Sequence, residues 1–165
     1  MANNNLSQFN TDVVFTAPYA VVLKNRTTGQ QQLNATQKFN SGDVISPFYA
    51  GETLSTPNYL TVQVGEHTHI TLQPSHLQYI NHSCKPNAFF NTDTMELIAL
   101  DTIEAGEEIT FFYPSTEWKM DQPFVCQCGK PECLQLIQGA AYLSNEILQH
   151  YRLTNFIQEQ ILQKV

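Results

Sequence analysis

The chain has 165 residues, a length typical of one domain, and 42% of them are hydrophobic, which is enough for a core. The net charge of −7 argues against a nucleic-acid-binding protein and suits a cationic partner such as a lysine-rich peptide. No segment approaches the roughly eighteen apolar residues of a membrane helix, so no membrane contact is expected.

The first ten residues, MANNNLSQFN, are polar and uncharged and do not resemble a signal peptide. We therefore expect a cytoplasmic protein, with a nuclear location as the alternative. In either compartment thiols stay reduced, so the four cysteines favour a metal site over disulfides.

Short strands are predicted along most of the chain. Residues 1–12 are expected to form a loose tail, and residues 12–23 two strands on either side of a proline. Further short apolar or alternating runs, separated by turns rich in glycine and asparagine, continue to residue 113. Closely spaced short strands of this kind predict a compact, mainly β domain.

The last part of the chain is predicted to be helical. Ser144 and Thr154 are candidate N-caps of two short helices. The apolar residues of the second helix fall on one broad face, and we expect this face to pack against the domain. A homodimer through the C-terminal helices is the alternative. The residues of the face are Phe156, Ile157, Ile161, Leu162 and Val165.

The cysteines are spaced for a metal site. Cys126, Cys128 and Cys133 form a C-x-C-x4-C pattern, and residues this close together do not pair easily as disulfides. Structural zinc takes four ligands, and thiolates are preferred among them. The remaining cysteine, Cys84, is the predicted fourth ligand. His67 or His69 is the alternative.

Several motifs together resemble a SET-domain protein lysine methyltransferase with a post-SET zinc motif. They are FNSGDVISPFYAGE, INHSCKPN, GEEITFFY and CQCGKPEC, they occur in the order of that family, and they cover about residues 35–133. The resemblance implies a β-clip fold with a C-terminal pseudoknot. It also implies a SET domain over residues 1–114, a post-SET zinc loop over 115–138 and a helical extension over 139–165.

The resemblance also assigns functions to individual residues. S-adenosylmethionine is expected to contact Asn81 and His82, with Leu134 near its adenine. Tyr113 is the expected catalytic tyrosine.

Two aromatic residues are expected to line the substrate channel. Tyr49 is one of them. Phe111 is the other, and it is expected to leave room for di- or trimethylation. The acceptor would be a lysine in a protein or peptide, histone or not.

Two other readings follow from the same residues. Gln30, Gln31 and Gln32 stand where the family usually has a G-x-G segment that lets the backbone approach the cofactor. A SET-fold binding or scaffold module with weak or no catalysis is therefore the first alternative. A thiol hydrolase that uses Cys84 with His82 is the second, and it fits poorly because a zinc-bound thiolate is not free to attack.

Overall fold

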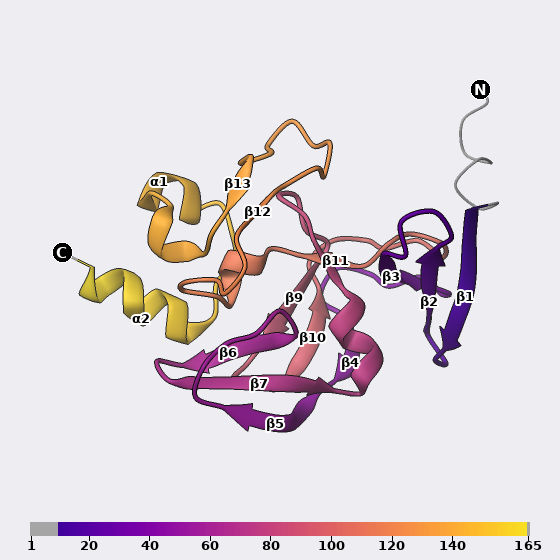
Figure 1. The fold of residues 1–165 in the computed structure, drawn as a ribbon, viewed down its shortest axis with the longest axis horizontal. Coiled ribbons are helices and arrows are strands. Elements are labelled where there is room, and N and C mark those ends of the chain that lie inside the picture. The colour runs from indigo at the N-terminus through magenta and orange to yellow at the C-terminus, as the bar shows by residue number, and fades with distance from the viewer. Residues whose placement is uncertain (1–9, 165) are drawn as a thin grey trace.

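A computed structural model describes residues 10–164 of the protein. Short β-strands form most of its regular structure, and two short helices lie near the C-terminus (Figure 1). The predicted mainly β fold is confirmed. Within the described residues no helix has the length and the hydropathy to cross a lipid bilayer.

The N-terminal strands form a three-stranded antiparallel sheet in the order β1-β2-β3, at one end of the molecule (Figure 1). The two strands predicted on either side of Pro18 are β1 and β2. Their bounds, with that of the third strand, are β1 (Thr11–Thr16), β2 (Ala20–Asn25) and β3 (Gln31–Ala35).

The predicted tail is shorter than residues 1–12. Asp12 already belongs to β1, where it pairs with Lys24. Its carboxylate accepts hydrogen bonds from the Arg26 guanidinium at 2.6 and 2.9 Å, which hold the start of the strand against its neighbour. The prediction was therefore wrong for this end of the tail, and residues 1–9 lie outside the described part.

Two further three-stranded antiparallel sheets form the body of the domain. Phe90 of β9 is fully buried and makes edge-to-face contacts with Phe48 and Phe111, with ring centroids 5.3 and 4.9 Å apart. This contact joins the two sheets to the segment that carries the site. One sheet is β4 (Val44–Pro47), β10 (Glu96–Ala99) and β9 (Ala88–Asn91); the other is β5 (Tyr49–Leu54), β7 (Thr68–Gln73) and β6 (Thr61–Gly65), each in that order.

A parallel pair of two-residue strands, β8 (Asn81–His82) and β11 (Thr110–Phe111), lies between distant parts of the chain. Asn87 stabilises the crossing: its amide donates to the Glu108 carbonyl and its side-chain oxygen accepts from the Thr110 N–H, both at 2.8 Å. The pairing is the contact that the predicted pseudoknot requires. Before β8 the chain forms the 3-10 helix η2 (Ser75–Tyr79).

The cysteine-rich loop lies between two short antiparallel strands, β12 (Phe124–Val125) and β13 (Leu136–Ile137). The sequence pattern did not predict this hairpin. It brings the two ends of the loop together beside the turn that follows β8.

Two capped helices complete the chain, α1 (Asn145–Leu148) and α2 (Asn155–Gln163), after the 3-10 helix η4 (Ala140–Tyr142). The side chains of Ser144 and Thr154 accept the first free backbone N–H groups, as predicted.

The apolar face of α2 packs against the domain. Ile157 is fully buried, and Phe156 and Ile161 lie in the same cluster with Trp118. Leu162, by contrast, is 82% exposed, so the predicted packing is confirmed only for the inner part of the face. Val165 lies outside the described residues, and a homodimer through this helix stays a prediction.

Candidate functional site

His82 connects two parts of the candidate site, the backbone of Tyr113 and the sulfur of Cys84. Its Nδ1 accepts the backbone N–H of Tyr113 at 3.1 Å, so the neutral ring carries its proton on Nε2. This Nε2–H donates to the sulfur of Cys84 at 3.3 Å. Burial lowers the pKa of His82 to about 4, so the ring is neutral near pH 7. Both ring nitrogens therefore serve to position neighbouring groups.

Tyr113 begins the 3-10 helix η3 (Tyr113–Ser115), with one residue between it and the end of β11. Its hydroxyl donates to the Ile80 carbonyl oxygen at 3.3 Å, and its ring lies 4.7 Å from Phe111 and 5.8 Å from Phe124. Burial raises the pKa of Tyr113 to about 12, so the phenol keeps its proton at neutral pH. It can orient a ligand by hydrogen bonding, but it is a poor source of a phenolate base.

The four cysteine sulfurs lie within 4.8 Å of one another, and those of Cys84 and Cys126 are 3.9 Å apart. Sulfurs on a tetrahedron about 2.3 Å from a zinc ion are separated by about 3.8 Å, so the spacing fits such a metal. The structure brings Cys84 to Cys128 and Cys133 as well, and neither His67 nor His69 belongs to the group.

The surroundings of the sulfurs also fit a cation. Backbone N–H groups of Leu134 and Cys128 donate to the sulfurs of Cys84 and Cys126 at 3.3 and 3.4 Å, contacts that stabilise thiolates. Burial raises the pKa of Cys84 far above its usual range and that of Cys126 to about 11. A metal ion at their centre would reverse this effect and deprotonate them.

The hydrolase reading is not supported by this geometry. Cys84 is only 2% exposed, so a substrate carbonyl has no access to its sulfur. Its high pKa keeps it a thiol unless a metal binds it, and a metal-bound sulfur is not a free nucleophile.

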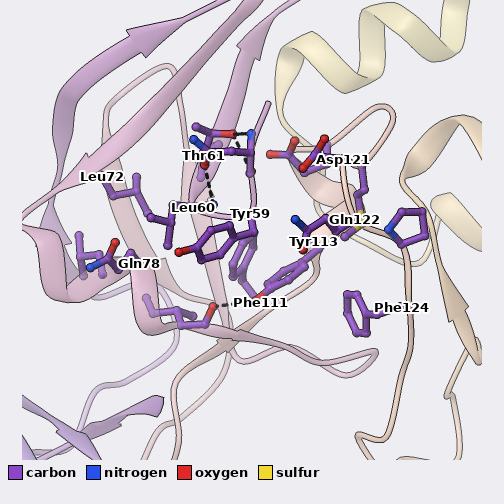
Figure 2. A pocket seen from close by; sticks show the side chains of 17 residues that line it. Tyr59, Leu60, Thr61, Leu72, Gln78, Phe111, Tyr113, Asp121, Gln122 and Phe124 are labelled. Carbon is purple, nitrogen blue, oxygen red and sulfur yellow. Dashed lines mark hydrogen bonds between the residues drawn. The ribbon is translucent and has the colours of Figure 1, made fainter. Parts of the chain in front are cut away.

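A pocket of about 340 Å³ lies beside Tyr113 (Figure 2). Its wall includes Phe111 and Tyr113, the apolar residues Leu72 and Phe124, and Tyr59 from the loop before β6. Phe111 is buried against Phe90 and also lines this cavity, and its place beside an acceptor stays a prediction.

Tyr49 does not line this pocket, and its place in a substrate channel stays a prediction. It is 62% exposed and is not among the residues that surround the cavity. The reason is the alternation of side chains along an extended segment: the preceding residue, Phe48, points into the core, so Tyr49 points outward from the edge strand β5.

The residues assigned to the methyl donor come from β8, which is Asn81 and His82, and from the cysteine loop, which carries Leu134. The Asn81 amide donates to the Gln31 carbonyl and to the Glu108 carboxylate, both at 3.0 Å. Leu134 lies in the apolar cluster that contains Cys84, Tyr113 and Phe124. The fold thus brings Gln31 close to Asn81, while Leu134 approaches from the cysteine loop.

Glu117 is a candidate functional residue that the sequence analysis missed. It is 8% exposed and lines the same pocket as Phe111 and Tyr113. Burial raises its pKa to about 7, against the lowering effect of hydrogen bonds from Gln63 and Thr116. No motif marks this residue, and only its position in the folded chain distinguishes it from the other glutamates.

Comparison with known proteins identifies the family. The SET-domain family model matches residues 12–114, more than half of the chain. The chain belongs to the SET-domain family. The resemblance inferred from the motifs is therefore confirmed.

Several curated relatives of this SET-domain protein bear names of methyltransferases. Methyltransferase flvH of Aspergillus flavus is 35% identical over 140 residues, which are 84% of this chain and 78% of that protein. The H3 lysine-36-specific histone-lysine N-methyltransferase of Saccharomyces cerevisiae is 33% identical over 87 residues, which are 49% of this chain and 12% of that protein. The protein of that name from Candida albicans is 39% identical over 69 residues, 38% of this chain and 8% of the relative.

The raised pKa of Glu117 predicts a change in stability with pH. The folded value of about 7 exceeds the ordinary value of 4.5, so ionisation is disfavoured in the folded state. The free energy of unfolding should be highest below pH 4.5, the ordinary pKa that Glu117 has in the unfolded chain. It should fall by on the order of 3 kcal/mol as the pH rises through about 7, the pKa in the folded state. In Glu117→Gln this loss should be absent when urea unfolding is followed from pH 4.5 to 8.

Glu66→Gln is the matched control, because Glu66 is exposed and lies outside the pocket. This variant should keep the pH dependence of the unaltered protein. Parallel pH profiles for the unaltered protein and Glu117→Gln would show that Glu117 ionises normally in the fold.

Proposed function

We propose that this SET-domain protein transfers methyl groups from S-adenosylmethionine to the side-chain amine of a lysine in a protein or peptide. The observation that carries the proposal is the neutral Tyr113 phenol, which lines an aromatic pocket together with Phe111 and is held in place through His82. The methyltransferase names of the relatives support the same activity.

The residues assigned to the methyl donor come from three separated segments. The Asn81 amide bonds to the Gln31 carbonyl, and Leu134 lies in one apolar cluster with Tyr113. In our proposal the backbone around Asn81 and His82 would hold the polar part of S-adenosylmethionine, and Leu134 would cover its adenine. When bound, this donor supplies an activated methyl group on a sulfonium sulfur.

The acceptor nitrogen must be neutral to attack that methyl group. For a free lysine with a pKa near 10.4, deprotonation at pH 7 costs about 4.6 kcal/mol. The aromatic walls formed by Phe111, Tyr113 and Phe124 exclude water and disfavour the ammonium form. The neutral amine would take the methyl group as the S–CH₃ bond of the donor breaks, and the methylammonium so formed would later lose its extra proton to solvent.

Positioning accounts for the rest of the chemistry. The Tyr113 hydroxyl and the Ile80 carbonyl oxygen, 3.3 Å apart, offer polar contacts that can align the amine with the methyl group. Since the pKa of Tyr113 is raised to about 12, the phenol acts as a hydrogen-bonding group and not as a base.

We further propose that Cys84, Cys126, Cys128 and Cys133 bind one zinc ion. Four thiolates close the coordination sphere, so the ion would be structural. It would tie the loop after β12 to the turn after β8 and so keep Leu134 beside Tyr113.

A binding module without catalysis remains the second candidate, because one observation favours it. The side-chain amide of Asn81 already donates to Gln31 and Glu108, and Gln31 belongs to the segment that lacks the glycines of the family. Calorimetric titration with S-adenosylmethionine separates the two functions, since a module that has lost the donor site gives no binding heat.

The acceptor is assigned only as a class. Two of the relatives are named for lysine 36 of histone H3, but the aligned segments span 12% and 8% of those proteins. A histone tail is therefore one proposed acceptor, beside other lysine-bearing proteins. The cytoplasmic location, with the nucleus as the alternative, also stays a proposal.

Tyr113→Phe should lower methyl transfer by about 10²–10³-fold, because the variant loses one hydrogen-bonding group that aligns the reacting amine. The measurement is incubation of the protein with radiolabelled S-adenosylmethionine and a cell lysate, followed by electrophoresis. A labelled band that disappears in the variant identifies both the activity and the target. Equal labelling by the two proteins would contradict the role of Tyr113.

Phe111→Tyr should shift the products toward monomethyllysine, because the added hydroxyl occupies space beside Tyr113 in the pocket. Mass spectrometry of the acceptor under excess methyl donor should show di- or trimethyllysine for the unaltered protein. A product series that stops at monomethyllysine in the unaltered protein would contradict this prediction.

Metal analysis should find one zinc ion per chain, and Cys126→Ser should lower this content because it removes a ligand from a closed site. Chelation should lower the melting temperature of the unaltered protein, since binding and local folding are coupled. A zinc-free protein with all four thiols reactive toward a thiol reagent under native conditions would refute the site.

A further inference from the structure

Glu117 is held rigidly in the wall of the pocket. One carboxylate oxygen, Oε1, accepts the backbone N–H of Gln63 at 2.9 Å and the Thr116 hydroxyl at 3.2 Å. The Gln63 side-chain oxygen accepts the N–H of Trp118 at 2.9 Å, which ties β6 to the turn after Tyr113. The Glu117 carbonyl accepts the Ala140 N–H at 2.9 Å.

Gly139 makes this anchoring possible. Its φ of +115° is unfavourable for other residues, and a Cβ at this position would lie 2.5 Å from the Trp118 carbonyl oxygen. The close approach places the chain before η4 directly against the backbone of Glu117. The carboxylate is thus preorganised by β6, by its own turn and by the C-terminal extension.

The other carboxylate oxygen, Oε2, has no hydrogen-bond partner among the described residues. No Lys, Arg or His is among the residues described as lining the pocket. Glu117 is buried, and a buried carboxylate with no cation beside it is costly when ionised. A ligand that carries a positive charge would remove this cost.

The group that carries this positive charge is not the nitrogen that accepts the methyl group. The reacting nitrogen must be neutral, and a carboxylate at hydrogen-bond distance would stabilise its ammonium form. The polar groups suited to the reacting nitrogen are the neutral hydroxyl of Tyr113 and the carbonyl of Ile80. The charge of Glu117 is therefore better matched to a second cationic group of the same acceptor.

We propose that Glu117 binds a second positively charged group of the acceptor, an ammonium or a guanidinium, while the amine to be methylated lies at Tyr113. This inference rests on the proposed methyl transfer and narrows its acceptor to a dicationic molecule. A lysine beside another basic residue has this chemistry, and so does a small alkyl diamine.

Asp121 adds a second negative charge to the pocket, which attracts a cation more weakly than Glu117 does. It lines the pocket, as Figure 2 shows, but it is exposed to solvent. Water and salt screen an exposed charge, so its effect on binding is smaller than that of a buried one. Specificity for the second cation therefore depends mainly on Glu117.

Matched probes with one and two positive charges test the inference. The small pair is hexylamine and 1,6-diaminohexane. The peptide set is acetyl-Ala-Lys-Ala-amide with two variants that carry Arg in place of either Ala. The protein should accept either the small amines or the peptides. Within the set that it accepts, the dicationic probe should bind about tenfold to a hundredfold more tightly than the monocationic one. Calorimetry measures the affinity, and radiolabelled S-adenosylmethionine measures KM and kcat.

Glu117→Gln should abolish this preference. Its amide oxygen can still accept from Gln63 and Thr116, so the fold is retained and only the charge is lost. KM for the dicationic probe should rise about tenfold or more, with a smaller change in kcat. Glu66→Gln should behave as the unaltered protein, and the melting temperatures of all three should be compared.

The outcomes separate this inference from the proposed activity. Probes that bind in a Glu117-dependent way but receive no methyl group would refute the methyl transfer and support the cation site. Equal affinity for the probes with one and two charges, or an unchanged preference in Glu117→Gln, would overturn the cation site. A purely structural role of Glu117 predicts equal losses for both kinds of probe.

Discussion

The parallel pairing of β8 with β11 is the constraint on which the candidate site depends. The register places His82 opposite Phe111, so the imidazole accepts the N–H of Tyr113 and donates to the sulfur of Cys84. Each strand contains only two residues, and side-chain bonds from Asn87 stabilise the crossing. A shift of one residue would separate the tyrosine, the histidine and the cysteine at once.

Closure of the pocket comes from a segment far along the chain. The hairpin of β12 and β13 presents the cysteine loop to Cys84, and Phe124 at its start becomes part of the pocket wall. Beyond it, the contact of Gly139 with Trp118 brings the C-terminal extension against Glu117. The extension thus contacts the backbone of a pocket residue, although none of its own residues is among those that line the pocket.

The sequence predicted those residues whose chemistry is visible in a local motif. The clustered cysteines, the NHSC segment and Tyr113 are of this kind, and so are the helix caps, because a capping side chain bonds to its own turn. The sequence did not show that Tyr49 lies outside this pocket, because the direction of its side chain depends on which neighbour enters the core. Glu117 was missed because its burial depends on β6 and η4, which are distant in sequence.

By itself, the sequence determined the mainly β class, the family and the four sulfurs suited to one metal, since these follow from composition, alternation and short motifs. Only the tertiary structure decided which side chains share a cavity. Burial raises the pKa values of Glu117 and Tyr113. Burial in turn depends on packed neighbours that are far apart in sequence. The chemistry of the pocket is therefore set by long-range contacts, while the identity of its groups is set locally.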